Sequence, residues 1–318
     1  MESDANIVVV APGQKVAPLN ECNIDSLVNM FLSSQDVAKS SRGLYKRTLK
    51  QYLYWIDIKG YHLNEIARPQ LLEYKQYLEE SGKSSLTVGS YITSIRKFYS
   101  WTEAIKVYPN VARELHNPKR NKQFRKQPLT PSQASDLLVY FQGQELRDYA
   151  LVNLLVRTGL RTVEAIRADV GDITHKGDKR VLLIQGKGHT DKDSFVVLTN
   201  KAYLPIKQYL DTRPGAKGNE PLFVSRSNRD QGERLTTRSV SRIAKEGLRA
   251  VGLDDKAYTA HSLRHTTAVN ILRAGGDLET VQLTLRHRNI NTTEIYTQTL
   301  NEERRLANSG EALLDNLY

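Results

Sequence analysis

The sequence predicts a mainly helical protein of two domains, with a small antiparallel β-sheet in the second domain. Three observations lead to this fold class. The 318 residues are too many for one small core, at roughly 100–200 residues per domain. Apolar residues recur at helical spacing along most of the chain, and only two short runs are rich in β-forming residues. Residues 113–128, between the two expected domains, form a segment rich in basic residues.

The first domain is expected to span residues 21–112 and to contain about four helices. One apolar stripe runs from Tyr45 to Ile56 and another from Val88 to Thr102, each with the period of a helix. A third helix is expected over 71–78. Pro69 helps to start it, because proline is tolerated in the first turn of a helix.

The second domain is expected to span residues 129–300. Two short runs, Arg180–Ile184 and Ser194–Leu198, are joined by a glycine-bearing segment and predict a β-hairpin. Periodic apolar segments predict helices over 132–141, 145–158, 201–212, 237–251, 262–274 and 278–285. The two ends, a flexible segment over 1–20 and residues 301–318, are expected to be tails.

The charge and the cysteine content narrow the function classes. A net charge of +11 and an isoelectric point near 9.5 indicate a polyanionic partner, nucleic acid before an anionic membrane surface. No early apolar run approaches the ~20 residues that span a bilayer. The single cysteine, Cys22, excludes an internal disulfide and a cysteine-cluster metal site, which fits a cytoplasmic protein.

Several basic residues are candidates for nucleic-acid contact. Arg42, Lys46 and Lys50 are spaced four apart, so they share one helical face. Further candidates in the segment 113–128 and on the helix over 237–251 are Lys119, Arg120, Lys122, Arg125, Lys126, Arg238 and Arg242. For the row Arg42, Lys46 and Lys50, a solvated surface without DNA contact is the commoner explanation. The segment 113–128 could be both a solvated linker between domains and a segment that neutralises DNA phosphates.

Four segments of the second domain carry candidate functional residues. They are Thr158-Gly-Leu-Arg-Thr-Val-Glu164, Gly186-Lys-Gly188, His261-Ser-Leu-Arg-His265, and Leu285-Arg-His-Arg288 followed by Thr293-Glu-Ile-Tyr296. Each alone has an ordinary structural explanation, such as a helix end or a hairpin turn. Together, and in this order, they resemble the tyrosine recombinase family, which includes lambda integrase and the Xer recombinases.

The resemblance covers nearly the whole chain and implies an architecture. Residues 21–112 resemble a helical core-binding domain, 113–128 a linker and 129–300 a catalytic domain, which together would form a C-shaped clamp on double-stranded DNA. Four protomers would assemble on paired specific sites, and an accessory DNA-bending or directionality protein is compatible with this. Residues 301–318, with several leucines, would then dock on a neighbouring subunit or pack on their own domain.

The resemblance also implies catalytic roles. Members of this family cut DNA by attack of a tyrosine on a phosphodiester. Arg161 and Arg264 would stabilise the negative charge that develops on the phosphate oxygens, because guanidinium groups match their geometry. Tyr296 would be the nucleophile and His261 the general base that takes its proton. His287 would hydrogen-bond the scissile phosphate.

Other residues of the four segments have less direct roles. Lys187 is expected to protonate the leaving 5′ oxygen, with Lys192 in the same hairpin as the alternative. Glu164 is expected to buttress the first arginine through a salt bridge, and His265 to pack in its helix or act as an accessory ligand. Arg286 departs from the family, where glycine is common. A positive φ there would strain an arginine, and an added phosphate contact is the other role considered.

The chemistry implied is strand exchange through a 3′-phosphotyrosyl link and a four-way junction. The covalent link conserves the energy of the broken phosphodiester, so no nucleotide cofactor and no metal are expected. Two alternatives remain: a type IB topoisomerase that relaxes DNA with the same residues, and a catalytically silent DNA-binding protein on the same fold.

Overall fold

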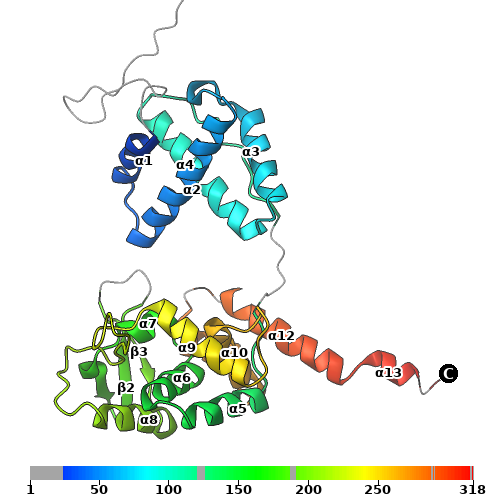
Figure 1. Ribbon diagram of the computed structural model, residues 1–318. Coiled ribbons are helices and arrows are strands. Elements are labelled where there is room, and N and C mark those ends of the chain that lie inside the picture. The colour runs from blue at the N-terminus through cyan, green and yellow to red at the C-terminus, as the bar shows by residue number, and fades with distance from the viewer. Residues whose placement is uncertain are drawn as a thin grey trace, which may run out of the picture. The chain divides into compact units, whose positions relative to one another are not determined.

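The computed structural model describes residues 24–119, 126–186, 191–287, 289, 291–315 and 317. The chain divides into two compact units, Met1–Gln123 and Phe124–Tyr318 (Figure 1). Each unit has its own apolar core. The expected tail over 1–20 lies outside the described residues, and so do the candidates Arg120, Lys122, Arg125 and Lys187.

The first unit is a helical bundle, in agreement with the sequence. Its elements are α1 (Ile24–Ser33), α2 (Lys39–Ile58), a 3-10 helix (Leu63–Glu65), α3 (Arg68–Glu80) and α4 (Ser85–Ala104). α2 packs against α1 and α4, and Pro69 lies in the first turn of α3. The core is rich in aromatic rings, and the buried hydroxyls of Tyr52 and Tyr99 hydrogen-bond to each other at 2.8 Å. That bond satisfies two polar atoms that burial would otherwise strand.

The second unit contains nine α-helices among the described residues. They are α5 (Pro131–Gln142), α6 (Leu146–Thr158), α7 (Thr162–Arg167), α8 (Asn200–Asp211), α9 (Thr237–Ala250), α10 (Ala260–Arg273), α11 (Leu278–Leu285), α12 (Asn291–Ala307) and α13 (Gly310–Leu314). The six helices predicted here agree with the structure to within two residues at each end. The short helix α7, which begins inside one of the four motif segments, was not predicted.

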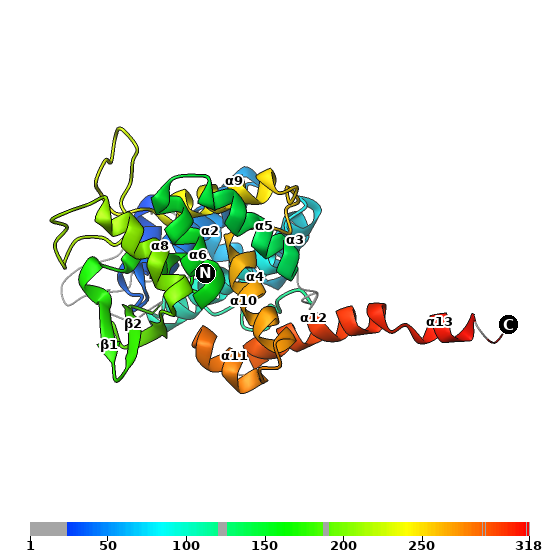
Figure 2. The ribbon, with the colours of Figure 1, turned by 90° about the horizontal axis from the view of Figure 1, so that it is seen from below.

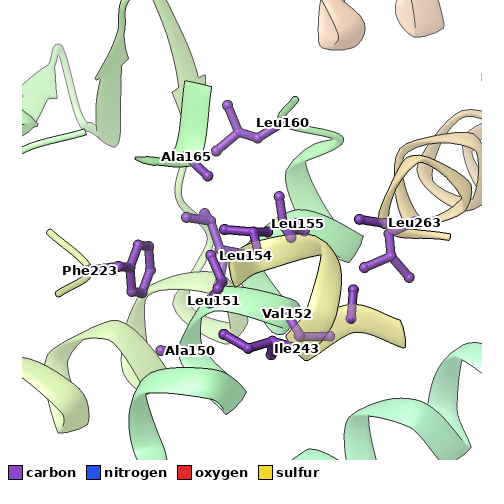
Figure 3. Packing of buried hydrophobic residues seen from close by; sticks show 14 of the residues in the cluster. Ala150, Leu151, Val152, Leu154, Leu155, Leu160, Ala165, Phe223, Ile243 and Leu263 are labelled. Atoms are coloured by element: carbon purple, nitrogen blue, oxygen red, sulfur yellow. The ribbon is translucent and has the colours of Figure 1, made fainter. Parts of the chain in front are cut away.

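α6 is the central helix of the second unit. α5, α8 and α10 pack against it. Its apolar residues face Phe223, Ile243 of α9 and Leu263 of α10 (Figure 3). A helix that is apolar on nearly all sides belongs in the middle of a domain. Because α6 is fixed by this packing, the segment that follows it, residues 159–164, begins at a fixed place in the core of the unit.

The sheet of this unit has three antiparallel strands in the order β1-β2-β3, where the sequence predicted two. They are β1 (Ile173–Lys176), β2 (Lys179–Ile184) and β3 (Ser194–Val197). β1 has only four residues, two of them exposed, so it lacks an apolar run. The sequence feature that indicates β1 is its turn: Gly177 and Asp178 join it to β2 as a hairpin, and Gly177 has a φ of 59°.

The C-terminal helices project from the rest of this unit (Figures 1 and 2). α12 runs without interruption past residue 300 to Ala307, and Arg273 of α10 binds Glu303 at 2.5 Å. Leu306 and Leu317 are 83% and 73% exposed, so neither packs on its own domain. None of the helices in the described part of the chain is long and apolar enough to cross a membrane.

Candidate active site

Arg161 and Glu164 lie where α6 ends and α7 begins. Gly159 has a φ of 61°, the left-handed conformation that ends α6 and turns the chain. Arg161 is the N-cap of α7: its backbone N–H donates to Glu164 Oε2 at 2.8 Å, and its Nη1 donates to Oε1 at 2.7 Å. The Glu164 side chain is only 1% exposed, whereas that of Arg161 is 33% exposed. The expected salt bridge is present, and it leaves the arginine reachable from solvent.

Arg264 is buried in α10 and held by two backbone carbonyls. Its Nη1 donates to the Gly159 oxygen at 2.5 Å and its Nη2 to the Leu285 oxygen at 2.6 Å. Both carbonyls stand at helix C-termini, where they lack partners within the helix. Burial, followed by the neighbouring charge of Arg161, lowers the pKa of Arg264 to about 10. The guanidinium therefore stays charged at neutral pH.

Two histidines of α10 lie one helical turn apart. The rings of His261 and His265 meet edge to face, with centroids 4.9 Å apart. His261 is the exposed member of the pair. Partial desolvation, and then the charges of Arg264, Arg161 and Lys126, lower its pKa. His265 is fully buried, which lowers its pKa to about 3. Both rings are therefore neutral at pH 7, and only His261 is open to solvent.

His287 and Tyr296 complete the cluster. His287 follows α11, and its Nδ1 hydrogen-bonds Thr293 Oγ1 at 2.9 Å. Its ring stacks on that of Tyr296 at 6.1 Å between centroids, while His265 meets the same tyrosine edge to face at 5.0 Å. Burial, ahead of the charge of Arg264, lowers the pKa of His287 to about 4. The tyrosine thus lies between two neutral imidazoles.

Burial and nearby positive charge act in opposite directions on the pKa of the Tyr296 hydroxyl. The residue is 3% exposed, and this burial raises its pKa above the ordinary value. The charges of Arg264 and Arg161, together with a hydrogen bond from Arg264, act in the opposite direction. A phenol in this position remains protonated until a base removes its proton.

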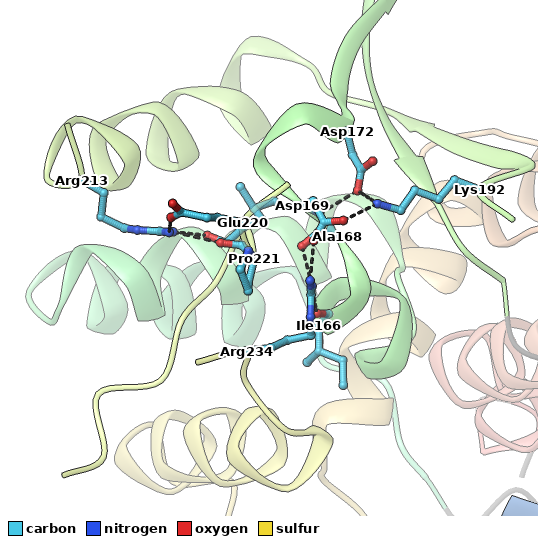
Figure 4. A network of polar contacts seen from close by, with 10 residues as sticks. Ile166, Ala168, Asp169, Asp172, Lys192, Arg213, Glu220, Pro221 and Arg234 are labelled. Atoms are coloured by element: carbon cyan, nitrogen blue, oxygen red, sulfur yellow. Dashed lines mark hydrogen bonds and ion pairs between the residues drawn. The ribbon is translucent and has the colours of Figure 1, made fainter. Parts of the chain in front are cut away.

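The second lysine of the hairpin is engaged in ion pairs. Lys192 Nζ lies 2.6 Å from Asp169 Oδ2 and 2.5 Å from Asp172 Oδ2 (Figure 4). Arg234 binds the other oxygen of Asp169 at 2.5 Å. These contacts tie the base of the hairpin to the loop after α7. Lys187, the preferred candidate, lies outside the described residues.

The row of basic residues on α2 is solvent-accessible but not independent of its surroundings. Arg42 and Lys46 are exposed and Lys50 is half-buried. Lys50 forms an ion pair with Asp25 of α1, and Arg42 donates to the Gln35 carbonyl at 3.0 Å. Both side chains keep further donors, so phosphate could bind beside those contacts or in place of them.

The remaining described candidates are distributed over the second unit and the end of the first. Lys119 is exposed. Lys126 donates to the Lys256 carbonyl at 2.6 Å, and its charge reaches His261. On α9, Arg238 and Arg242 are both exposed, and Arg242 pairs with Glu246 at 3.0 Å. Only Lys126 among these is brought to the histidine cluster.

Two contacts that hold candidate site residues in place were not predicted from the motifs. Thr293 Oγ1 fixes the His287 ring, and the Gly159 carbonyl holds Arg264. The left-handed C-cap was visible in the Thr-Gly sequence, but no pattern links that carbonyl to an arginine 105 residues later. Among the residues that the structure describes, no group of three His, Cys, Asp or Glu side chains could hold a metal ion.

The arrangement suits an anion and a proton transfer. Three guanidinium groups (Arg161, Arg264, Arg286) surround one buried carboxylate, Glu164, which leaves an excess of positive charge. Next to this excess stand neutral imidazoles and a phenol. Charge stabilisation of this kind is commonly the largest contribution to phosphoryl-transfer catalysis.

Comparisons with known proteins agree with the fold and identify a family. The profile of the phage integrase family matches residues 127–303, and that of the phage integrase N-terminal SAM-like domain matches residues 24–106. The XerC tyrosine recombinase of Herpetosiphon aurantiacus is 30% identical over 268 residues, which cover 81% of this chain and 84% of that protein. The XerC of Caldanaerobacter subterraneus subsp. tengcongensis is 32% identical over 254 residues, covering 76% and 68%.

A solved structure shares the fold. The XerH site-specific recombinase, crystallised on a palindromic difH substrate as a post-cleavage complex, superposes with a TM-score of 0.71 at 21% identity. The superposition covers 90% of this chain and 84% of that chain. The family profile spans more than half of the sequence, and two relatives reach 30% identity over most of their length. The chain therefore belongs to the phage integrase family of tyrosine recombinases.

Proposed function

We propose that this protein is a site-specific recombinase that cuts and rejoins double-stranded DNA through a 3′-phosphotyrosyl link to Tyr296. One observation carries the proposal. Arg161, Arg264, His287 and Tyr296 come from three of the four motif segments, the rings of His287 and Tyr296 stack, and the charges of both arginines act on the histidine and the tyrosine. A structural role for each residue alone gives no reason for this convergence.

In the cleavage step, the Tyr296 oxygen attacks the scissile phosphorus. A P–O bond to the tyrosine forms as the bond from phosphorus to the 5′ oxygen breaks. His261 takes the phenolic proton: its lowered pKa keeps the ring neutral and so able to accept a proton, and its exposed position leaves it open to solvent. Arg161 and Arg264 bind the non-bridging oxygens as their charge increases.

The leaving 5′ oxygen takes a proton from a lysine, and we assign Lys187. The engagement of Lys192 with two carboxylates supports that assignment, because Lys192 would have to leave both to reach DNA. His287 binds the phosphate, with its ring held by Thr293. The free 5′-hydroxyl of a partner strand then attacks the phosphotyrosine, and the tyrosine is released with its proton restored.

Two such rounds pass through a four-way junction and require four protomers on paired DNA sites. Domains over 21–112 and 129–300 would supply core binding and catalysis, respectively. The basic rows on α2 and α9 would neutralise phosphates, so DNA affinity should fall with added salt. An accessory DNA-bending protein and the trans docking of residues 301–318 belong to this proposal, as does a cytoplasmic location, where such DNA is found.

Covalent trapping tests the proposal. Duplexes with a randomised core and a nick that lets the short 5′-hydroxyl strand diffuse away are incubated with the wild type and with Tyr296→Phe. A protein–DNA adduct on a denaturing gel from the wild type alone is expected, and sequencing of the trapped DNA identifies the site.

Two other outcomes favour the alternatives. Salt-sensitive binding with no adduct would favour a silent DNA-binding protein. An adduct at arbitrary sequences, with relaxation of supercoiled plasmid and no exchange between paired sites, would favour a topoisomerase.

A further inference from the structure

Arg286 occupies a position that does not suit an arginine backbone. It caps the C-terminus of α11 with φ 55° and ψ 48°, in the left-handed region. A non-glycine residue there costs roughly 1 kcal/mol relative to glycine. Its Nε is also buried with no hydrogen-bond partner in the described part of the chain. Two unfavourable features at one residue call for a contact that offsets them.

That contact is with the buried carboxylate. Arg286 Nη2 donates to Glu164 Oε2 at 2.8 Å, and Nη1 donates to the Thr284 carbonyl at 2.7 Å. The Arg286 side chain is 13% exposed, so its donors are directed to the protein interior. Glu164 Oε2 thus receives two donors, the Arg286 guanidinium and the Arg161 backbone N–H. The other oxygen, Oε1, is left to the Arg161 side chain.

This division of the carboxylate determines what Arg161 can do. Its contact with Oε1 uses one N–H of a guanidinium that has five, and the side chain remains one-third exposed. A carboxylate whose Oε2 is bound by both Arg286 and the Arg161 backbone N–H is held in one orientation. The remaining donors of this part-exposed side chain are therefore available to an anion.

We propose that Arg286 is a positioning residue that acts through Glu164: it holds the buried carboxylate in place and ionised, so that Arg161 presents its other donors to the scissile phosphate. The inference rests on the proposed function. It replaces a direct phosphate contact by Arg286, which the inward direction and the low exposure of that side chain disfavour.

The ionisation of Glu164 supports this assignment. Burial opposes the charged form, but the charge of Arg286 and the hydrogen bonds of Arg161 outweigh it, and the pKa of Glu164 lies below its ordinary value. The other groups that face this carboxylate are Arg264 of α10 and His287 after α11. Loss of the Arg286 charge should therefore raise the pKa of Glu164.

The test is a double-mutant cycle on Arg286→Gly and Glu164→Gln, with Arg286→Lys as the conservative variant. Glycine suits the left-handed backbone, so the first variant removes the side chain and relieves strain. The rate of adduct formation is measured on the nicked duplex at saturating DNA, from pH 5 to 8. Thermal unfolding of each variant confirms folding at the assay temperature.

Arg286→Gly should slow adduct formation about 10- to 100-fold, as expected for a displaced catalytic group. The acid limb of its pH profile should move to higher pH, and DNA affinity and its salt dependence should stay close to wild type. Arg286→Lys should recover most of the rate and the wild-type acid limb. In the Glu164→Gln background, Arg286→Gly should have little further effect.

Two results overturn the inference alone, both with a wild type that forms adduct. One is an Arg286→Gly defect that is undiminished in the Glu164→Gln background. The other is a salt slope of DNA binding that falls by about one, the sign of a direct phosphate contact. A wild type that forms no adduct overturns the proposed function, and the inference with it.

Discussion

Replacement of Gly159 by alanine should show how far Arg264 depends on its backbone support. A Cβ at this residue would lie 2.5 Å from Leu285 Cδ2 and 3.4 Å from the Thr267 side chain, and the φ of 61° disfavours any side chain. Both Gly159 and Leu285 supply the carbonyls that hold the Arg264 guanidinium. The substitution therefore crowds Leu285, one of the two residues whose carbonyls hold the arginine that we propose to be catalytic.

The magnitude follows from two contributions. Left-handed backbone strain in alanine costs about 1 kcal/mol. The clash with Leu285 adds about 1–3 kcal/mol of overpacking. The free energy of unfolding should fall by about 2–4 kcal/mol. Gly177→Ala is the matched control, because Gly177 lies in the same unit with a φ of 59° and nothing within 4 Å of its added Cβ, so only the strain of about 1 kcal/mol applies.

Urea unfolding followed by far-UV circular dichroism measures both variants. Tryptophan fluorescence is unsuited, because Trp55 and Trp101 both belong to the first unit. Adduct formation at a temperature well below both unfolding midpoints should be about 10-fold or more slower for Gly159→Ala and unchanged for Gly177→Ala. Equal losses of stability in the two variants, or adduct formation at the wild-type rate by Gly159→Ala, would refute the reasoning.

Two further predictions concern buried charge. His265 has a folded-state pKa of about 3 against an ordinary 6.5, so the unfolded chain binds one more proton between these values, and the unfolding free energy should fall by up to about 1.4 kcal/mol per unit as pH drops below 6.5. His265→Phe should flatten that slope in urea titrations at pH 6.5, 5.5 and 4.5, and an unchanged slope would contradict the assignment. Asp169→Asn should lower the unfolding free energy by about 1–3 kcal/mol, because Lys192 and Arg234 share that half-buried carboxylate. Asp211→Asn, which removes an exposed ion pair, should cost under about 0.5 kcal/mol, and similar losses for the two variants would show that the network adds no stability.

The elements that could be predicted from the sequence are those with a strong local signal. The helix over 278–285 was predicted from its apolar period and agrees at both ends, with Val281 and Leu285 buried and with Asp277 accepting a hydrogen bond from the Thr280 N–H at the start. β1 could not be found by its composition, since its four residues are stabilised by pairing with β2 and not by their own burial. Local patterns identify elements that bury a face and miss those that depend on a neighbour.

The candidate site divides in a similar way. The motifs made Arg161, Glu164 and Tyr296 candidates, and the family resemblance raised the question of a positive φ at Arg286, for which the structure has 55°. The partner of Arg286 was not predictable, because Glu164 lies 122 residues earlier and only the folded chain brings the two side chains together. Long-range contacts of this kind require the fold and not the pattern.

The positive charge of the cluster has two uses that depend on each other. Burial, and after it the arginines that would bind a phosphate, lower the pKa of His261 and His287, so both rings are neutral before DNA arrives. A neutral imidazole can accept a proton, but a low pKa makes it a weak base. A bound phosphodiester brings one negative charge among the same guanidinium groups and offsets part of their effect, so the pKa of His261 should rise at the moment a base is needed. The histidine would therefore become a stronger base only when substrate is present, and the buried Tyr296 would keep its proton at all other times.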